Sequence, residues 1–127
     1  MSLVNIKTFD IVYVDFGKPE GSVQGGIRPC VVVQNDAGNK FSSTSIVMPL
    51  TSVIKKVDQP THGIVKKDDA NGLTYDSMII GEQMRVVGES RIKDKIGYIC
   101  HQEDKDEVIR VYLANLFGSK KVKVEVA

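Results

Sequence analysis

The 127-residue sequence carries 17 Lys and Arg against 16 Asp and Glu, a formal net charge of +1, which argues against a general polyanion-binding protein. Hydrophobic residues make up 42% and charged residues 26%, the composition of a globular domain long enough to bury a core without disulfides or a structural metal. No apolar run approaches the roughly 18 residues that a membrane span needs, so we expect one soluble domain over residues 1–127.

The start of the chain and the cysteine content favour a cytoplasmic protein. No basic and then apolar signal region precedes the first predicted strand, and two cysteines are too few for a disulfide framework. Cys30 and Cys100 both have apolar neighbours, and neither lies in a CxxC or a Cys/His metal-ligand spacing. We therefore predict two buried thiols, no metal site and no cofactor.

The first half of the chain predicts three strands. Residues 10–16 (DIVYVDF) alternate β-branched and aromatic residues and predict a strand, which a glycine-rich loop at 17–27 follows. Proline cannot donate to a ladder, so Pro29 is expected to start the second strand, whose apolar run Cys30–Val33 is typical of burial on both faces. Residues 35–45 predict turns, and residues 46–50 (IVMPL) predict a strand that Pro49 stops.

The second half predicts two more strands and a helix. Residues 63–67 and 77–88 have strand character, and Gly81 breaks the second at the point where a bulge would turn a barrel corner. Short strands with frequent glycines predict a small closed antiparallel barrel of roughly five to seven strands. Residues 103–118 open with acids, keep helical spacing and end on Gly118, which predicts a helix on the barrel. The tail 120–127 suits either an edge strand or a disordered end.

Motifs of the familiar enzyme classes are absent from the sequence. It contains no Walker loop, no HExxH, no CxxC pair and no GxSxG, and its GG loop does not match a dinucleotide fingerprint. What remains is a set of polar residues at the predicted strand ends: Arg28, Asn35, Asp36, Thr51, Ser52, Thr61, His62, Ser77, Glu82, Gln83 and Arg85.

Six features in order resemble the MazF/PemK family of bacterial toxins: DIVYVDF, GSVQGGIRPCVVVQND, IVMPLTS, PTH, DSMIIGEQMRVV and a closing amphipathic helix. The resemblance covers about residues 8–118. It implies an SH3-like antiparallel barrel with a C-terminal helix, in a cytoplasmic homodimer. It also implies a growth-inhibiting endoribonuclease that cuts single-stranded RNA at short sequences without a metal. The implied partner is a MazE-like antitoxin whose acidic C-terminal segment covers the RNA groove.

The resemblance also assigns residues to the site. The family's catalytic arginine and threonine fall on Arg28 and Thr51. Candidate substrate contacts are Ser22, Gln24, Gly25, Asn35, His62, Ser77 and Gln83. A guanidinium at the seam between a loop and a strand can direct its donors at a phosphate, and fixed donors favour the more negative five-coordinate transition state.

Two questions about proton transfer stay open in the sequence. Arginine remains protonated at neutral pH and is a poor general base. An unperturbed histidine has a suitable range, but a lone histidine such as His62 is more often just a surface residue. Many relatives carry Glu where this chain has Val23. Valine has no proton to exchange, and we expect that this carboxylate is dispensable here because Arg28 and Thr51 are retained.

Other interpretations of the same residues exist. Arg28 is also compatible with a surface ion pair, and Thr51 with a turn or a helix cap. The rival functions are a non-catalytic SH3-like binding module and a CcdB-like toxin that inhibits gyrase. For phosphate steering we expect only one of two lysine pairs, Lys55–Lys56 or Lys66–Lys67, to contribute.

Overall fold

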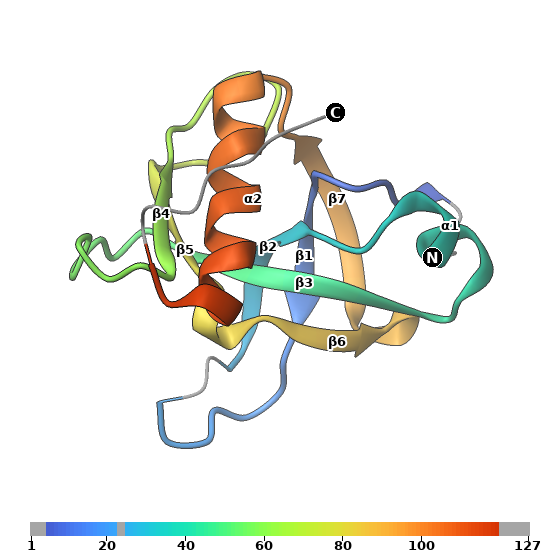
Figure 1. Ribbon diagram of the computed structural model, residues 1–127. Coiled ribbons are helices and arrows are strands. Elements are labelled where there is room, and N and C mark those ends of the chain that lie inside the picture. Colours follow the sequence, from blue (N-terminus) through green and yellow to red (C-terminus); the bar gives the residue numbers. More distant parts are fainter. Residues whose placement is uncertain (1–4, 23–24, 120–127) are drawn as a thin grey trace.

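The computed structural model describes residues 5–22 and 25–119, and Figure 1 shows a curved sheet with one long helix packed against it. The elements in chain order are β1 (Asp10–Asp15), β2 (Ile27–Val32), α1 (Asp36–Phe41), β3 (Thr44–Thr51), β4 (His62–Val65), β5 (Ser77–Ile80), the 3₁₀ helix η2 (Gly81–Gln83), β6 (Arg85–Gly88), the 3₁₀ helix η3 (Glu89–Arg91), β7 (Ile92–Tyr98) and α2 (Gln102–Phe117). The strand order is β4-β5-β3-β2-β1-β7, and β6 pairs with β3.

The mainly β fold is as predicted, but the sheet is not a closed barrel. Every strand pairing is antiparallel. Within the described residues, however, β4 and β7 do not pair, so the seven-stranded sheet stays open. The predicted break at Gly81 is confirmed, because η2 separates β5 from β6 there.

The sequence predicted that Pro49 stops the third strand, but β3 continues past it to Thr51. Along one side of β3, β6 pairs with Thr44–Val47 and β5 pairs with Leu50 and Thr51. Pro49 lies between these two pairings, where no neighbouring strand needs its missing N–H. The longer strand carries Thr51 at its very end.

Two further elements differ from the prediction. Residues 35–45 were expected to form turns but contain α1, which begins because the Asn35 side chain accepts a hydrogen bond from the Gly38 N–H at 2.8 Å. β7 was not predicted, because its residues are largely charged and exposed and only Ile92 is fully buried. Cys30 is buried as expected, whereas Cys100 is exposed, contrary to the prediction.

The sheet buries side chains on both faces, in alternation along the central strands. Val12 and Val14 of β1 belong to one cluster, whereas Ile11 belongs to the other. β2 and β3 divide their apolar residues in the same way, as the period of two in a strand requires. This double burial explains why the central strands are apolar at nearly every position.

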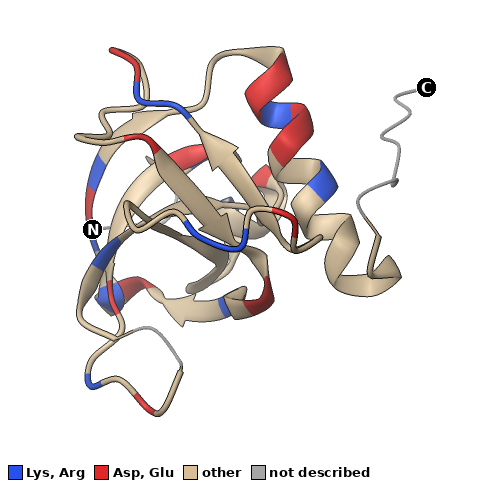
Figure 2. Ribbon diagram, turned by 90° about the vertical axis from the view of Figure 1, so that its left-hand side faces the viewer, with Lys and Arg blue, Asp and Glu red and all other residues tan. Residues whose placement is uncertain are grey.

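Helix α2 closes the second cluster and confirms the predicted C-terminal helix. Its first turn carries Glu103 and Asp104, which favour a helix start, and Figure 2 shows acidic residues gathered in this part of the helix. Val108 and Val111 pack into the cluster. Gly118 ends the helix in the left-handed conformation with φ 65°.

No described helix is long and apolar enough to cross a membrane. The tail 120–127, for which the sequence left two alternatives, lies outside the described residues, as do Val23 and the candidate contact Gln24.

Candidate functional site

Arg28 lies at the start of β2, opposite Val14 of β1, and a contact from the preceding loop holds its side chain. Its Nε donates to the carbonyl of Gly25 at 3.0 Å. Gly25 itself is buried, and a Cβ there would collide with Pro19, so the close approach of the loop requires glycine. Among the described residues, Arg28 makes no ion pair and its side chain donates only through Nε, so none of these residues takes up the four N–H groups of its two terminal nitrogens.

Thr51 reaches the same region from the opposite direction, at the end of β3 and beside Met78 of β5. Its Oγ1 accepts a hydrogen bond from the Val53 N–H at 3.1 Å, which fixes the hydroxyl at the first turn after the strand. The hydroxyl proton remains free to donate, because that contact uses only an acceptor lone pair.

Arg28 and Thr51 together line two adjoining hollows. The first, of about 530 Å³, is also lined by predicted contacts, namely Ser22, His62 and Gln83. The second, of about 280 Å³, includes the predicted contact Ser77. A third hollow of about 340 Å³ shares Glu82 and Gln83 with the first. Because neighbouring hollows share these lining residues, we refer to the three together as the Arg28 groove.

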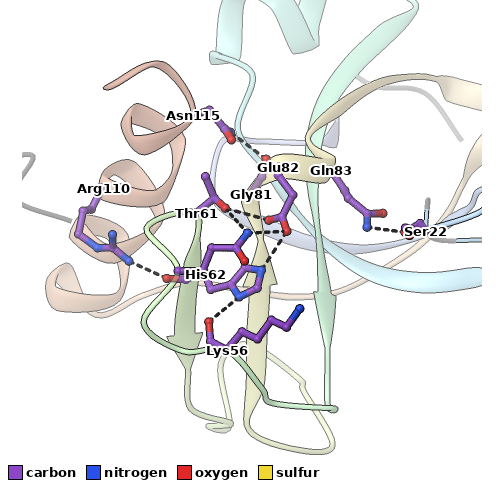
Figure 3. A network of polar contacts seen from close by, with 10 residues as sticks. Ser22, Lys56, Thr61, His62, Gly81, Glu82, Gln83, Arg110 and Asn115 are labelled. Carbon is purple, nitrogen blue, oxygen red and sulfur yellow. Dashed lines mark hydrogen bonds and ion pairs between the residues drawn. The ribbon is translucent and has the colours of Figure 1, made fainter. Parts of the chain in front are cut away.

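His62 is buried in the wall of the groove and is not the surface residue that a lone histidine suggests; its side chain is 7% exposed. Its Nδ1 lies 2.9 Å from the Lys56 carbonyl and its Nε2 lies 3.0 Å from a carboxylate oxygen of Glu82 (Figure 3). A carbonyl and a carboxylate are both acceptors, so both contacts are hydrogen bonds only when both ring nitrogens carry a proton. In this arrangement neither ring nitrogen is available to take a proton from a substrate.

Glu82 is the acidic partner of His62, and neighbouring groups surround it. Thr61 Oγ1 donates to one oxygen at 3.0 Å, and Gln59 Nε2 donates to the other at 3.0 Å. Burial acts to raise the pKa of Glu82, but hydrogen bonds from its own backbone, His62 and Thr61 outweigh it and hold the pKa below its ordinary value. Arg28, Lys55 and Lys56 outnumber Glu82 among the charged residues that line the first hollow, so this hollow is positive.

Helix α2 lies beside the His62–Glu82 pair and binds the backbone next to both residues (Figure 3). Arg110 donates to the carbonyls of Pro60 and His62 at 2.9 and 2.8 Å, and Asn115 donates to the carbonyl of Gly81 at 2.8 Å. Gln83 in turn donates to the Ser22 carbonyl at 2.8 Å and ties η2 to the loop before β2. These contacts hold the groove walls against one another.

Two of the predicted contacts have other roles or positions. Ser77 is buried and donates to the Tyr75 carbonyl at 2.9 Å, although it lines the second hollow. Asn35 lines none of the three hollows of the groove and caps α1, which Figure 1 shows at the other end of the sheet from β4. Of the two lysine pairs, Lys55–Lys56 lies on the groove and Lys66–Lys67 lines a separate hollow.

Asn35→Ala is therefore expected to reduce stability by about 1 kcal/mol through loss of the helix cap, with no change in the activity of the groove. Asn35→Asp is the matched control, because aspartate retains the capping oxygen. Thermal unfolding of the three proteins measures the difference. A loss of activity in Asn35→Ala without a loss of stability would return Asn35 to the groove.

Glu82 and Arg110, which organise the groove, carry no distinctive signal in the sequence. Glu82 was only one of several polar residues at strand ends, and Arg110 was one charge on the face of a predicted helix. Both act across long sequence separations, of 20 residues for His62–Glu82 and 48 for Arg110–His62. No local pattern in the sequence encodes such pairings.

Comparisons with known proteins are consistent with this geometry. The model of the family described as "PemK-like, MazF-like toxin of type II toxin-antitoxin system" matches residues 7–114. Endoribonuclease EndoA of Bacillus subtilis strain 168 is 39% identical over 112 residues, which cover 86% of this chain and 95% of that protein. Endoribonuclease MazF of Staphylococcus saprophyticus is 41% identical over 97 residues, covering 76% and 80%. A mycobacterial endoribonuclease solved in complex with its cognate antitoxin shares the fold with a TM-score of 0.70 at 16% identity, covering 87% and 94%.

Proposed function

The chain belongs to the PemK-like, MazF-like family of toxins of type II toxin–antitoxin systems, and we propose that it is an endoribonuclease that cleaves single-stranded RNA in the Arg28 groove. The observation that carries the proposal is the convergence of Arg28 and Thr51. They come from the start of β2 and the end of β3, yet they line the same hollows. A groove of neighbouring hollows, the first of which is positive, suits an extended strand of RNA rather than a compact ligand.

The proposed reaction is attack by a ribose 2′-OH on the adjacent phosphate. The 2′-oxygen forms a bond to phosphorus, the bond to the 5′-oxygen breaks, and the products carry a 2′,3′-cyclic phosphate and a 5′-OH. The five-coordinate transition state is more negative than the ground state, so donors fixed in advance stabilise it selectively. Arg28 supplies guanidinium N–H groups and Thr51 supplies its hydroxyl.

The proton steps are assigned to water rather than to His62. Both ring nitrogens of His62 already face acceptors, and Arg28 stays protonated. Water accepts the 2′-OH proton and supplies the proton that the 5′-oxygen takes up. His62 instead keeps Glu82 paired, so that no uncompensated carboxylate faces the phosphates.

The further substrate contacts that we propose are Ser22, Gly25, His62, Ser77 and Gln83, with Gln24 and Val23 outside the described residues. The dispensability of a carboxylate at position 23 remains a prediction. We also treat residues 1–127 as one domain.

The proposed partners follow from the family. A type II toxin is held inactive by a protein antitoxin, and we propose a MazE-like antitoxin whose acidic segment occupies the Arg28 groove, where Arg28, Lys55 and Lys56 accept carboxylates in place of phosphates. We further propose that the toxin is a cytoplasmic homodimer that inhibits translation and growth by cutting mRNA.

Lys55 and Lys56 are expected to steer the phosphates of RNA. The double substitution of both to alanine should weaken RNA binding and lower the slope of log affinity against log salt by about 0.7 for each phosphate contact that is lost. The matched control is the double alanine variant at Lys66 and Lys67, which should bind as the wild type does. Fluorescence anisotropy with a 2′-O-methyl RNA that resists cleavage measures both. Equal salt slopes in the two variants would contradict the assignment.

Incubation of the purified protein with RNA in EDTA tests the proposal. Cleavage is expected to continue, because every group assigned to the reaction belongs to the protein or to water. Binding of a protein partner without cleavage would instead favour the SH3-like binding module, and inhibition of gyrase would favour the CcdB-like toxin.

A further inference from the structure

Three side chains with metal-binding atoms converge outside the Arg28 groove. Asp68 follows β4, and Cys100 and His101 join β7 to α2. A carboxylate oxygen of Asp68, the Sγ of Cys100 and a ring nitrogen of His101 all lie within 4.8 Å of one another. His101 Nε2 lies 3.7 Å from Asp68 Oδ2. The sequence did not predict this group, because the turn that holds Asp68 reaches the Cys–His pair only in the folded chain.

The turn after β4 orients the Asp68 carboxylate. Asp68 Oδ1 accepts from the Asn71 N–H at 2.7 Å, which leaves Oδ2 directed toward His101. Asn71 is itself buried, donates to the Lys66 carbonyl at 2.9 Å and accepts from Leu73 N–H at 3.0 Å. A carboxylate whose second oxygen is already bonded is the usual arrangement around a metal ligand.

The Cys100–His101 segment is held equally firmly. The turn after β4, which carries Asp68, contacts β7: the Tyr98 N–H donates to the Ala70 carbonyl of this turn at 3.0 Å. A Cβ at Gly97 would collide with the backbone of this turn, so glycine permits the close approach. On the other side, the His101 carbonyl accepts from the first turn of α2, from Lys105 N–H at 3.0 Å. Both halves of the group therefore sit on fixed backbone.

The surface around Asp68 and His101 is acidic. The adjoining hollow of about 510 Å³ has four carboxylates and two lysines among its lining residues: Asp68, Glu103, Asp104 and Glu107 against Lys66 and Lys67. Such crowding of carboxylates is relieved by a bound cation.

We propose that Asp68, Cys100 and His101 form a binding site for a borderline transition-metal ion, with Zn²⁺ as the preferred metal and water as the fourth ligand. Thiolate, imidazole and carboxylate are the ligands that Zn²⁺ takes in tetrahedral sites, at about 2.0–2.3 Å, whereas Mg²⁺ and Ca²⁺ prefer oxygen alone. A nitrogen and an oxygen ligand of such a tetrahedron lie about 3.3–3.5 Å apart, so the 3.7 Å between His101 Nε2 and Asp68 Oδ2 needs only a small adjustment. Cys100 is exposed, so its side chain has room to rotate toward the other two ligands.

The bound metal would tie the turn after β4 to the start of α2. It would lie outside the Arg28 groove and take no part in RNA cleavage. Its effect would be on stability, because a ligand that binds only the folded state raises the free energy of unfolding.

Titration of the purified protein with Co²⁺ tests the site directly, since a cobalt–thiolate bond gives a charge-transfer band in the near ultraviolet. One Co²⁺ per chain is expected to produce the band, and Zn²⁺ should abolish it by displacement. Cys100→Ala should lose the band, while His101→Ala and Asp68→Asn should weaken metal binding by at least about tenfold. Cys30→Ala is the matched control, because the Cys30 thiol is buried, and it should keep the band. A band that survives in Cys100→Ala would overturn the proposal.

Thermal unfolding gives a second readout that does not depend on spectroscopy. Zn²⁺ at about a hundredfold excess over its Kd should raise the Tm by about 5–15 °C. The shift should vanish in Cys100→Ala, whose metal-free Tm should match that of the wild type because the side chain is exposed. An equal Zn²⁺ shift in both proteins would show that the metal binds elsewhere, and the absence of any shift or Co²⁺ band in the wild type would remove the site.

Discussion

Arg28→Ala is expected to slow RNA cleavage by about a hundred- to a thousandfold, which corresponds to about 2.7–4 kcal/mol of lost transition-state stabilisation. The guanidinium is positioned before the substrate arrives, through its Nε contact with the Gly25 carbonyl. Its remaining donors face a groove that Thr51 also lines. Removing it takes away a charged donor that water cannot replace with the same geometry.

Single-turnover cleavage of a short RNA measures this effect, with thermal unfolding as the check on the fold. Arg28→Lys should recover only part of the rate, because lysine keeps the charge but loses the planar set of donors. Arg91→Ala is the matched control: Arg91 is exposed and donates to the Asp15 carbonyl at 3.2 Å, away from the groove. A wild-type rate in Arg28→Ala would show that the arginine has no catalytic role.

Thr51→Val is expected to reduce the cleavage rate by about ten- to a hundredfold, or roughly 1.4–2.7 kcal/mol in the barrier. Valine keeps the shape and the β-branch but removes the hydroxyl that would donate to the phosphate. It also removes the acceptor that fixes the Val53 N–H at the end of β3. Both losses act at the same place, although only the first acts in the transition state.

Thr51→Ser separates the two contributions of this residue to the rate. Serine retains the donor and the acceptor, so its rate should stay within a few-fold of the wild type. Rates are compared at saturating RNA so that changes in binding do not enter. If Thr51→Val and Thr51→Ser were equally slow, the methyl group and its packing would matter instead of the hydroxyl.

Much of the fold follows from local patterns in the sequence. The strand near residues 10–16, the break at Gly81 and the helix ending at Gly118 were predictable, because hydrophobic period and glycine conformation are local properties. The prediction that Pro49 ends a strand was wrong. A proline's missing N–H matters only where a neighbouring strand would accept it, and neither β5 nor β6 pairs with β3 at Pro49. β7 was missed because its charged side chains face outward and give it little hydrophobic period.

The candidate site was predictable to a lesser extent. Arg28 and Thr51 came from the family resemblance, and the structure brings them to shared hollows. Asn35 stays a predicted substrate contact, although it caps α1 and lines none of the three hollows of the groove. The His62–Glu82 pair and the metal-binding group at Cys100 depend on contacts between distant segments. Such contacts are set by the tertiary fold and leave no local trace in the sequence.

Cleavage by the 2′-OH is tested most directly by the mass of the fragments that the protein releases from a short RNA in EDTA. We expect a 2′,3′-cyclic phosphate on the upstream fragment, a 5′-OH on the downstream fragment, and no cleavage when the attacking ribose is replaced by 2′-deoxyribose. Fragments ending in 3′-OH and 5′-phosphate, or cleavage of the 2′-deoxy substrate, would contradict it.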